Sequence, residues 1–102
     1  MEPMNELTAE QYAQAHRAFA HALALCRTRL PIEAIQDVEH WLQHDELELA
    51  FESLGLSIMR ERVVLGSEQR MNLFPLGPLL GLDRESVLSA SFWEDVSPLL
   101  RP

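Results

Sequence analysis

The residues of this chain best suited to chemistry are two histidines and an aspartate within the stretch "DVEHWLQH". His40 and His44 are four residues apart, a spacing that places two imidazoles on one face of a helix, and Asp37 precedes His40 by three residues. Such a set could supply two or three ligands to zinc. No Glu immediately follows His40, however, so the zinc-protease helix pattern is absent. We therefore expect neither a metal nor any other cofactor.

Other catalytic signatures are absent from the sequence. It contains no glycine-rich phosphate loop, no nucleophile elbow, and no Cys and His pair at a useful spacing. The single cysteine, Cys26, follows Phe19 and Ala22 on an apolar helical stripe, which predicts a small core residue rather than a nucleophile. We therefore expect that the protein is not an enzyme.

The length and composition suit a single domain spanning residues 1–102. The chain has 102 residues, of which 47% are hydrophobic. Its first seven residues are acidic and polar where a signal peptide would be basic and then apolar, and its longest uncharged run, residues 71–82, is interrupted by Pro and Gly. We expect no secretion, no membrane span and a cytoplasmic location.

The net charge of −8 is concentrated in the middle of the chain. Residues 30–59 carry seven acids and no Lys or Arg, whereas residues 1–29 carry three acids and three arginines and residues 60–102 carry six acids and five arginines. Acidic surfaces repel nucleic acid and anionic lipid and attract basic partners. We therefore expect a basic protein partner and no direct binding to nucleic acid or membranes.

Helical periodicity runs through most of the chain and predicts an all-α fold, a compact bundle of about four to five helices. The expected helices cover about 9–29, 31–43, 45–62, a short segment from 66 limited by Pro75, and 84–93. Thr8 and Gln11 form a capping box for the first helix, and Asp45 with Glu48 could form another for the third. Only residues 62–65 could be extended.

A central antiparallel hairpin of the second and third helices would bring several acids together. With a turn at residues 43–45, Asp37 and Glu52 would each lie about six residues from the turn, roughly 9 Å along the axis. Glu48 and Glu52 would be a like-charge pair on one face, which costs a few tenths of a kcal/mol. The alternative is that these acids form only a solvent-exposed face of the hairpin and bind no partner. The expected partner-binding residues are Asp37, His40, His44, Asp45, Glu48 and Glu52.

Three of the acids have a competing structural interpretation. Asp45, Glu46 and Glu48 fall in the expected first turn of the third helix, where free N–H groups and the helix dipole favour negative charge by roughly 0.3 to 1 kcal/mol each. These three acids could cap the third helix or contact the partner. The same explanation does not apply to Asp37 or Glu52, which lie in the middle of their expected helices.

Two stretches, "LPIEAIQDVEHWLQHDELELAFESL" at 30–54 and "LGLD" at 80–83, carry a family resemblance. The chain resembles the small helical immunity proteins of bacterial polymorphic toxin systems, such as those of contact-dependent inhibition, and looks most similar to the Maf-type immunity family. The residues that match the family's motifs are Leu30, Pro31, Glu46, Leu49, Ala50, Glu52, Leu54, Gly81, Leu82 and Asp83. The chain departs from the pattern at Asp45, where the family has glycine.

The resemblance implies a protein that binds and neutralises a cognate toxin domain, often a nuclease, and does no chemistry itself. A basic nuclease surface would complement the acidic segment, so we expect such a toxin domain as the partner of a chain that is a monomer or weak dimer when free. Two alternatives stay open. A cytoplasmic secretion chaperone would also be small and acidic but usually contains a sheet, and a regulatory helical adaptor would be encoded beside a transcription factor.

Overall fold

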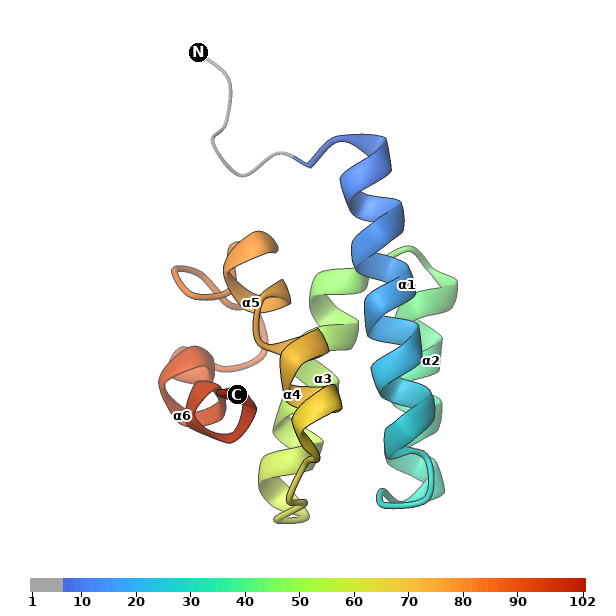
Figure 1. The fold of residues 1–102 in the computed structure, drawn as a ribbon, viewed down its shortest axis with the longest axis vertical. Helices are drawn as coiled ribbons and strands as arrows, with labels where there is room; N and C mark the ends of the chain where they lie inside the picture. The colour runs from blue at the N-terminus through green and yellow to red at the C-terminus, as the bar shows by residue number, and fades with distance from the viewer. Residues whose placement is uncertain (1–6) are drawn as a thin grey trace.

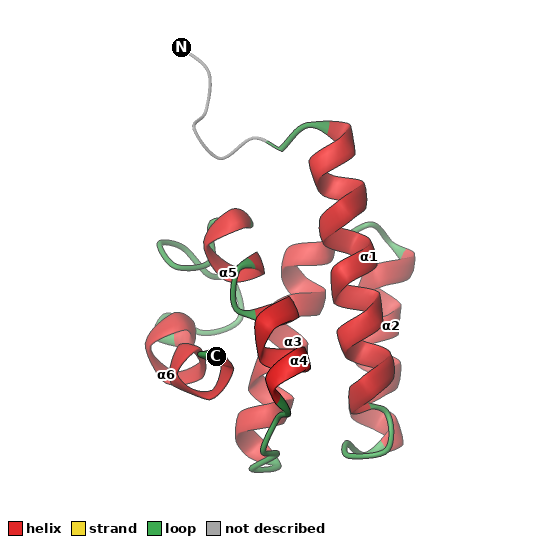
Figure 2. Ribbon diagram, viewed as in Figure 1, coloured by secondary structure: helices red, strands yellow, loops and turns green. Residues whose placement is uncertain are grey.

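The computed structural model describes residues 7–102 and places most of them in helices (Figure 1). The helices are α1 (Ala9–Cys26), α2 (Ile32–Gln43), α3 (Leu47–Arg60), α4 (Ser67–Leu73), the single turn α5 (Leu76–Leu79) and α6 (Phe92–Leu100). No strand occurs between residues 7 and 102 (Figure 2). The predicted all-α class is therefore confirmed. The first six residues, on which the argument against a signal peptide depends, lie outside the described part.

The predicted central hairpin is confirmed in α2 and α3, which run antiparallel and contact each other more extensively than any other pair of helices (Figure 1). Pro31 precedes α2, and its carbonyl accepts the N–H groups of Ala34 and Ile35. Proline suits this place because its missing N–H would have no partner in the first turn. The apolar face of α2 then buries Ile35 and Val38 against α3.

The turn between α2 and α3 is closed by Asp45 in a left-handed conformation, with a φ of 55°. The Asp45 N–H donates to the Leu42 carbonyl at 3.2 Å, and the Glu46 N–H donates to the Trp41 carbonyl at 2.9 Å. These are the paired bonds of a Schellman motif, in which glycine usually takes the left-handed place. The prediction that Asp45 caps α3 reciprocally with Glu48 is wrong, because Asp45 ends α2 and the N-cap of α3, Glu46, makes no side-chain capping bond.

The same motif ends two more helices. Arg62, with a φ of 54°, follows α3, and Gly81, with a φ of 79°, follows α5. In each case the N–H groups of the left-handed residue and of the residue after it donate to carbonyls in the last turn of the helix. This is why α3 ends at Arg60 instead of continuing to Arg62 as expected.

The core is built around α3, which contacts α1, α2 and α6. Phe51 on α3 lies between Phe19 of α1 and Phe92 of α6, with ring centroids 6.1 Å from each. Aromatic pairs at this separation add to the stability that burial provides. Cys26 is fully buried in this core, as predicted, and burial raises the pKa of its thiol.

The predicted helix over residues 84–93 is wrong. Residues 84–91 form turns and an irregular loop, and the last helix starts only at Phe92. Phe92, Val96 and Leu100 recur every four residues and are all buried, so their apolar stripe holds α6 against the core although Pro98 lies within the helix. The close approach of α6 to α3 needs Gly55, where a Cβ would lie 2.9 Å from both Phe92 and Val96.

Candidate functional site

Four polar residues, Glu33, Asp37, His40 and His44, lie along the exposed face of α2, and we call them the α2 stripe. The ion pairs formed within residues 7–102 join His21 to Glu68, Arg27 to Glu39 and Arg84 to Asp83. None of them includes a carboxylate of the α2 stripe. Glu39, another mid-helix acid of α2, is therefore explained by its pair with Arg27, the residue that follows α1, whereas Asp37 has no ionic partner in the described chain.

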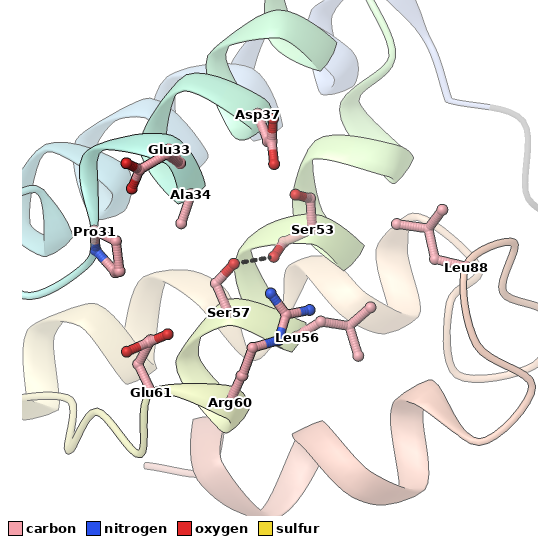
Figure 3. A pocket seen from close by; sticks show the side chains of 10 residues that line it. All are labelled: Pro31, Glu33, Ala34, Asp37, Ser53, Leu56, Ser57, Arg60, Glu61 and Leu88. Atoms are coloured by element: carbon pink, nitrogen blue, oxygen red, sulfur yellow. Dashed lines mark hydrogen bonds between the residues drawn. The ribbon is translucent and has the colours of Figure 1, made fainter.

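A groove of about 320 Å³ lies between the α2 stripe and α3, and we call it the α2–α3 groove (Figure 3). It is lined by Pro31, Glu33, Ala34, Asp37, Ser53, Leu56, Ser57, Arg60, Glu61 and Leu88. The Ser57 hydroxyl donates to the Ser53 carbonyl at 2.9 Å, so it is committed to its own helix. Arg60 is the only cation in this lining and forms no ion pair with the described acids. The groove is thus suited to binding a cationic group.

Glu52 does not lie on this surface, and the prediction that it contacts a partner there is wrong. Its side chain is fully buried, and its carboxylate accepts hydrogen bonds from the backbone N–H groups of Val87 and Leu88 at 3.0 to 3.1 Å. The helix geometry explains the error, because one residue further along α3 turns the side chain by about 100°. Ser53, and not Glu52, shares the α2–α3 groove with Asp37.

The buried carboxylate of Glu52 holds the loop of residues 84–91 in place. Burying an unpaired charge costs several kcal/mol, and hydrogen bonds to a charged acceptor, at about 1.5 to 3 kcal/mol each, offset that cost. The loop that Glu52 anchors carries two apolar side chains outward, since Val87 is 73% exposed and Leu88 is 46% exposed. We call these two residues the apolar ridge. Sequence reasoning did not identify the ridge, because it placed residues 84–93 in a helix.

A second groove, of about 280 Å³, borders the same loop at Val87, and we call it the loop groove. It is lined by Glu46, Glu48, Leu49, Leu80, Gly81, Leu82, Glu85 and Val87. Two of the acids predicted at the start of α3, Glu46 and Glu48, therefore face the ridge from this side. Asp45 is exposed next to them. Each residue of the apolar ridge thus lines a groove that also contains carboxylates.

Tyr12 of α1 supports the turn that carries these acids. Its hydroxyl donates to the carbonyl of Asp45 at 3.0 Å. Burial raises the pKa of the Tyr12 phenol above its ordinary value, and the carboxylates of Glu48, Asp45 and Glu46 raise it further, against a lowering by a backbone hydrogen bond at Leu47. Tyr12 thus links α1 to the turn between α2 and α3.

The two histidines of the α2 stripe contact each other with their rings tilted by 45°. Their ring centroids are 4.5 Å apart, and Nδ1 of His44 lies 2.8 Å from the carbonyl oxygen of His40. His40 also contacts Trp41 edge to face, with centroids 5.3 Å apart. Among residues 7–102 no three His, Cys, Asp or Glu side chains are grouped closely enough to hold a metal ion. The two imidazoles thus contact each other at the C-terminal end of α2 and form no metal site in the described part of the chain.

Comparison of the chain with protein-family models, with curated proteins and with solved structures gave no match. Within residues 7–102, no helix combines the length and the hydropathy that crossing a bilayer requires.

Proposed function

We propose that this chain is an immunity protein, which binds and neutralises a cognate toxin domain with a basic surface. The observation that carries the proposal is a set of exposed or half-buried carboxylates along the α2–α3 hairpin: Glu33 and Asp37 on α2, Asp45 in the turn, and Glu46 and Glu48 at the start of α3. These carboxylates form no ion pair within residues 7–102. Mutual repulsion among them destabilises the free protein, and a basic partner would relieve it.

The resemblance to Maf-type immunity proteins supports the same proposal at two positions. Asp45 is left-handed at the place where that family has glycine, so the chain keeps the backbone that glycine favours. Glu52, the acid that follows Leu-Ala in the family pattern, anchors the loop that comes after Gly81. The first matching stretch is therefore joined by hydrogen bonds to the loop that follows the second.

The proposed partner is a nuclease-type toxin domain. Such a domain holds phosphates with Lys and Arg, and carboxylates that occupy the same basic surface would exclude the nucleic acid. The chain itself would bind neither nucleic acid nor membranes and would act in the cytoplasm as a monomer or weak dimer. A secretion chaperone is less well supported, because residues 7–102 contain no strand from which its usual sheet could be built.

Charge reversal in cells tests the proposal. The toxin domain encoded next to this gene is expressed together with the wild-type chain, with Glu33→Arg/Asp37→Arg, or with Glu10→Arg/Glu94→Arg. The second variant changes the net charge equally but reverses exposed acids of α1 and α6. We expect protection by the wild type and the control, and loss of protection with the α2 variant. Full protection by all three would contradict a role for the α2 stripe, and no protection by any would contradict the immunity function.

A further inference from the structure

The apolar ridge is unusual because a buried charge fixes a loop whose side chains point outward. Val87 and Leu88 both donate their backbone N–H groups to Glu52, which is fully buried and forms no ion pair within residues 7–102. A loop that only connects α5 to α6 could hydrogen-bond to water at these positions. Fixing the loop before a partner arrives lowers the entropy lost on binding. The loop thus has the rigidity of a preformed contact surface.

Each residue of the apolar ridge borders a different acidic groove. Leu88 lines the α2–α3 groove together with Asp37, and Val87 lines the loop groove together with Glu48 (Figure 3 shows the Leu88 side). Interfaces are commonly organised in this way, with an apolar centre and a polar rim. Here the rim is negative on both sides of the centre, and Arg60 is the only cation among the lining residues named for these two grooves.

We propose that the apolar ridge and its two grooves bind a basic amphipathic segment of a partner protein. Apolar side chains of that segment would contact Val87 and Leu88, and its Lys or Arg side chains would reach the carboxylates in the grooves. Charge complementarity selects this occupant, because an acidic segment would be repelled from both sides and a purely apolar one would leave the carboxylates without partners. The inference rests on the proposed function as a binding protein, and it names the chemistry of the segment that the toxin domain presents.

A peptide titration tests this inference without the toxin. The probe is a short synthetic peptide in which leucine alternates with arginine, and the matched control peptide has glutamate in place of arginine. Binding is followed by the ¹H–¹⁵N chemical shifts of the full chain. We expect the arginine peptide to shift the amides of residues 84–91 and of the groove-lining parts of α2 and α3, and the glutamate peptide to shift none of them. Shifts located elsewhere, or equal binding of the two peptides, would overturn the proposal.

Two double variants distinguish the contribution of the apolar ridge to peptide binding from the contribution of the carboxylates. Val87→Ser/Leu88→Ser removes the ridge, and the control Val64→Ser/Met71→Ser removes two apolar side chains that are 82% and 63% exposed elsewhere. We expect the first variant to bind the arginine peptide about tenfold more weakly and the control to bind it unchanged. All four side chains are exposed, so neither variant should unfold the protein. Equal affinity of both variants would show that the carboxylates alone attract the peptide, and the docking site would be refuted.

Glu52→Gln tests whether the buried carboxylate positions the ridge. Gln keeps the shape of Glu, but its amide NH₂ group cannot accept a hydrogen bond from the loop. We expect increased fast motion of the Val87 and Leu88 amides in ¹⁵N relaxation and a weaker complex with the arginine peptide, while the helical circular dichroism is unchanged. An unchanged loop would refute the positioning role.

The two proposals can fail separately. Peptide binding at the ridge without toxin protection would leave the docking site standing and refute immunity. Toxin protection that depends on the α2 stripe, without peptide binding at the ridge, would refute only the docking site.

Discussion

Replacing Glu52 by Ala should be among the most destabilising changes to a charged residue of this protein. The substitution removes the acceptor for the N–H groups of Val87 and Leu88 and leaves a cavity between α3 and the loop. Two hydrogen bonds to a charged acceptor contribute about 3 to 6 kcal/mol, and relief of the buried charge returns part of that. We expect a net loss of about 3 kcal/mol, which corresponds to a fall in melting temperature of roughly 10 °C or more.

Urea unfolding followed by circular dichroism measures this loss, and Glu46→Ala is the matched control. Glu46 is also an acid at α3, but it is exposed and makes no side-chain capping bond, so its replacement should change the free energy of unfolding by less than about 0.5 kcal/mol. Glu52→Gln should fall between the two, because its one oxygen can still accept from the loop. Equal stability of Glu52→Ala and Glu46→Ala would refute the anchoring role of the carboxylate.

Three further predictions concern the turn after α2, the packing of α6 against α3, and the pKa of Tyr12. Asp45→Gly should stabilise the protein by about 0.5 to 1 kcal/mol in urea unfolding, because glycine adopts the left-handed conformation without strain, whereas Asp45→Ala should not stabilise it. Gly55→Ala should destabilise by about 1 to 2 kcal/mol despite the better helix propensity of Ala, because the new Cβ would lie 2.9 Å from Phe92 and Val96. A titration followed by ultraviolet absorbance should give Tyr12 a pKa above that of an ordinary phenol. Because its pKa is raised in the folded state, its contribution to the stability of the fold is complete below about pH 10 and is lost as the pH rises through the raised pKa.

The sequence predicted the helices best where one apolar face repeats over several turns. The stretch from Ile32 to Gln43 has a single apolar face and follows a proline, and its helix agreed with the prediction to within a residue. The prediction for the C-terminal region was wrong because it placed the helix at residues 84–93, whereas the buried residues Phe92, Val96 and Leu100 place it at Phe92–Leu100. The position of this last helix is therefore set by its packing against the core.

The candidate site could be predicted only where exposure followed from one helix alone. Asp37 and His40 are exposed because the opposite face of α2 is apolar, and the sequence reveals that directly. Glu52 is buried because the loop of residues 84–91 folds over a second face of α3, a contact between positions 35 and 36 residues apart. The small Gly55, three residues after Glu52, was the one sequence signal that this face is covered.

The association rate with the cognate toxin domain, measured by stopped flow at increasing salt, tests the central claim most directly. If the α2 stripe steers and holds a basic partner, the wild-type rate should fall steeply with salt, and Glu33→Arg/Asp37→Arg should lower the low-salt rate by about tenfold or more. Glu10→Arg/Glu94→Arg, with the same net charge, should remain close to the wild type. Equal association rates and equal affinities for the two variants would contradict the claim and would mean that the α2 stripe is a solvated surface.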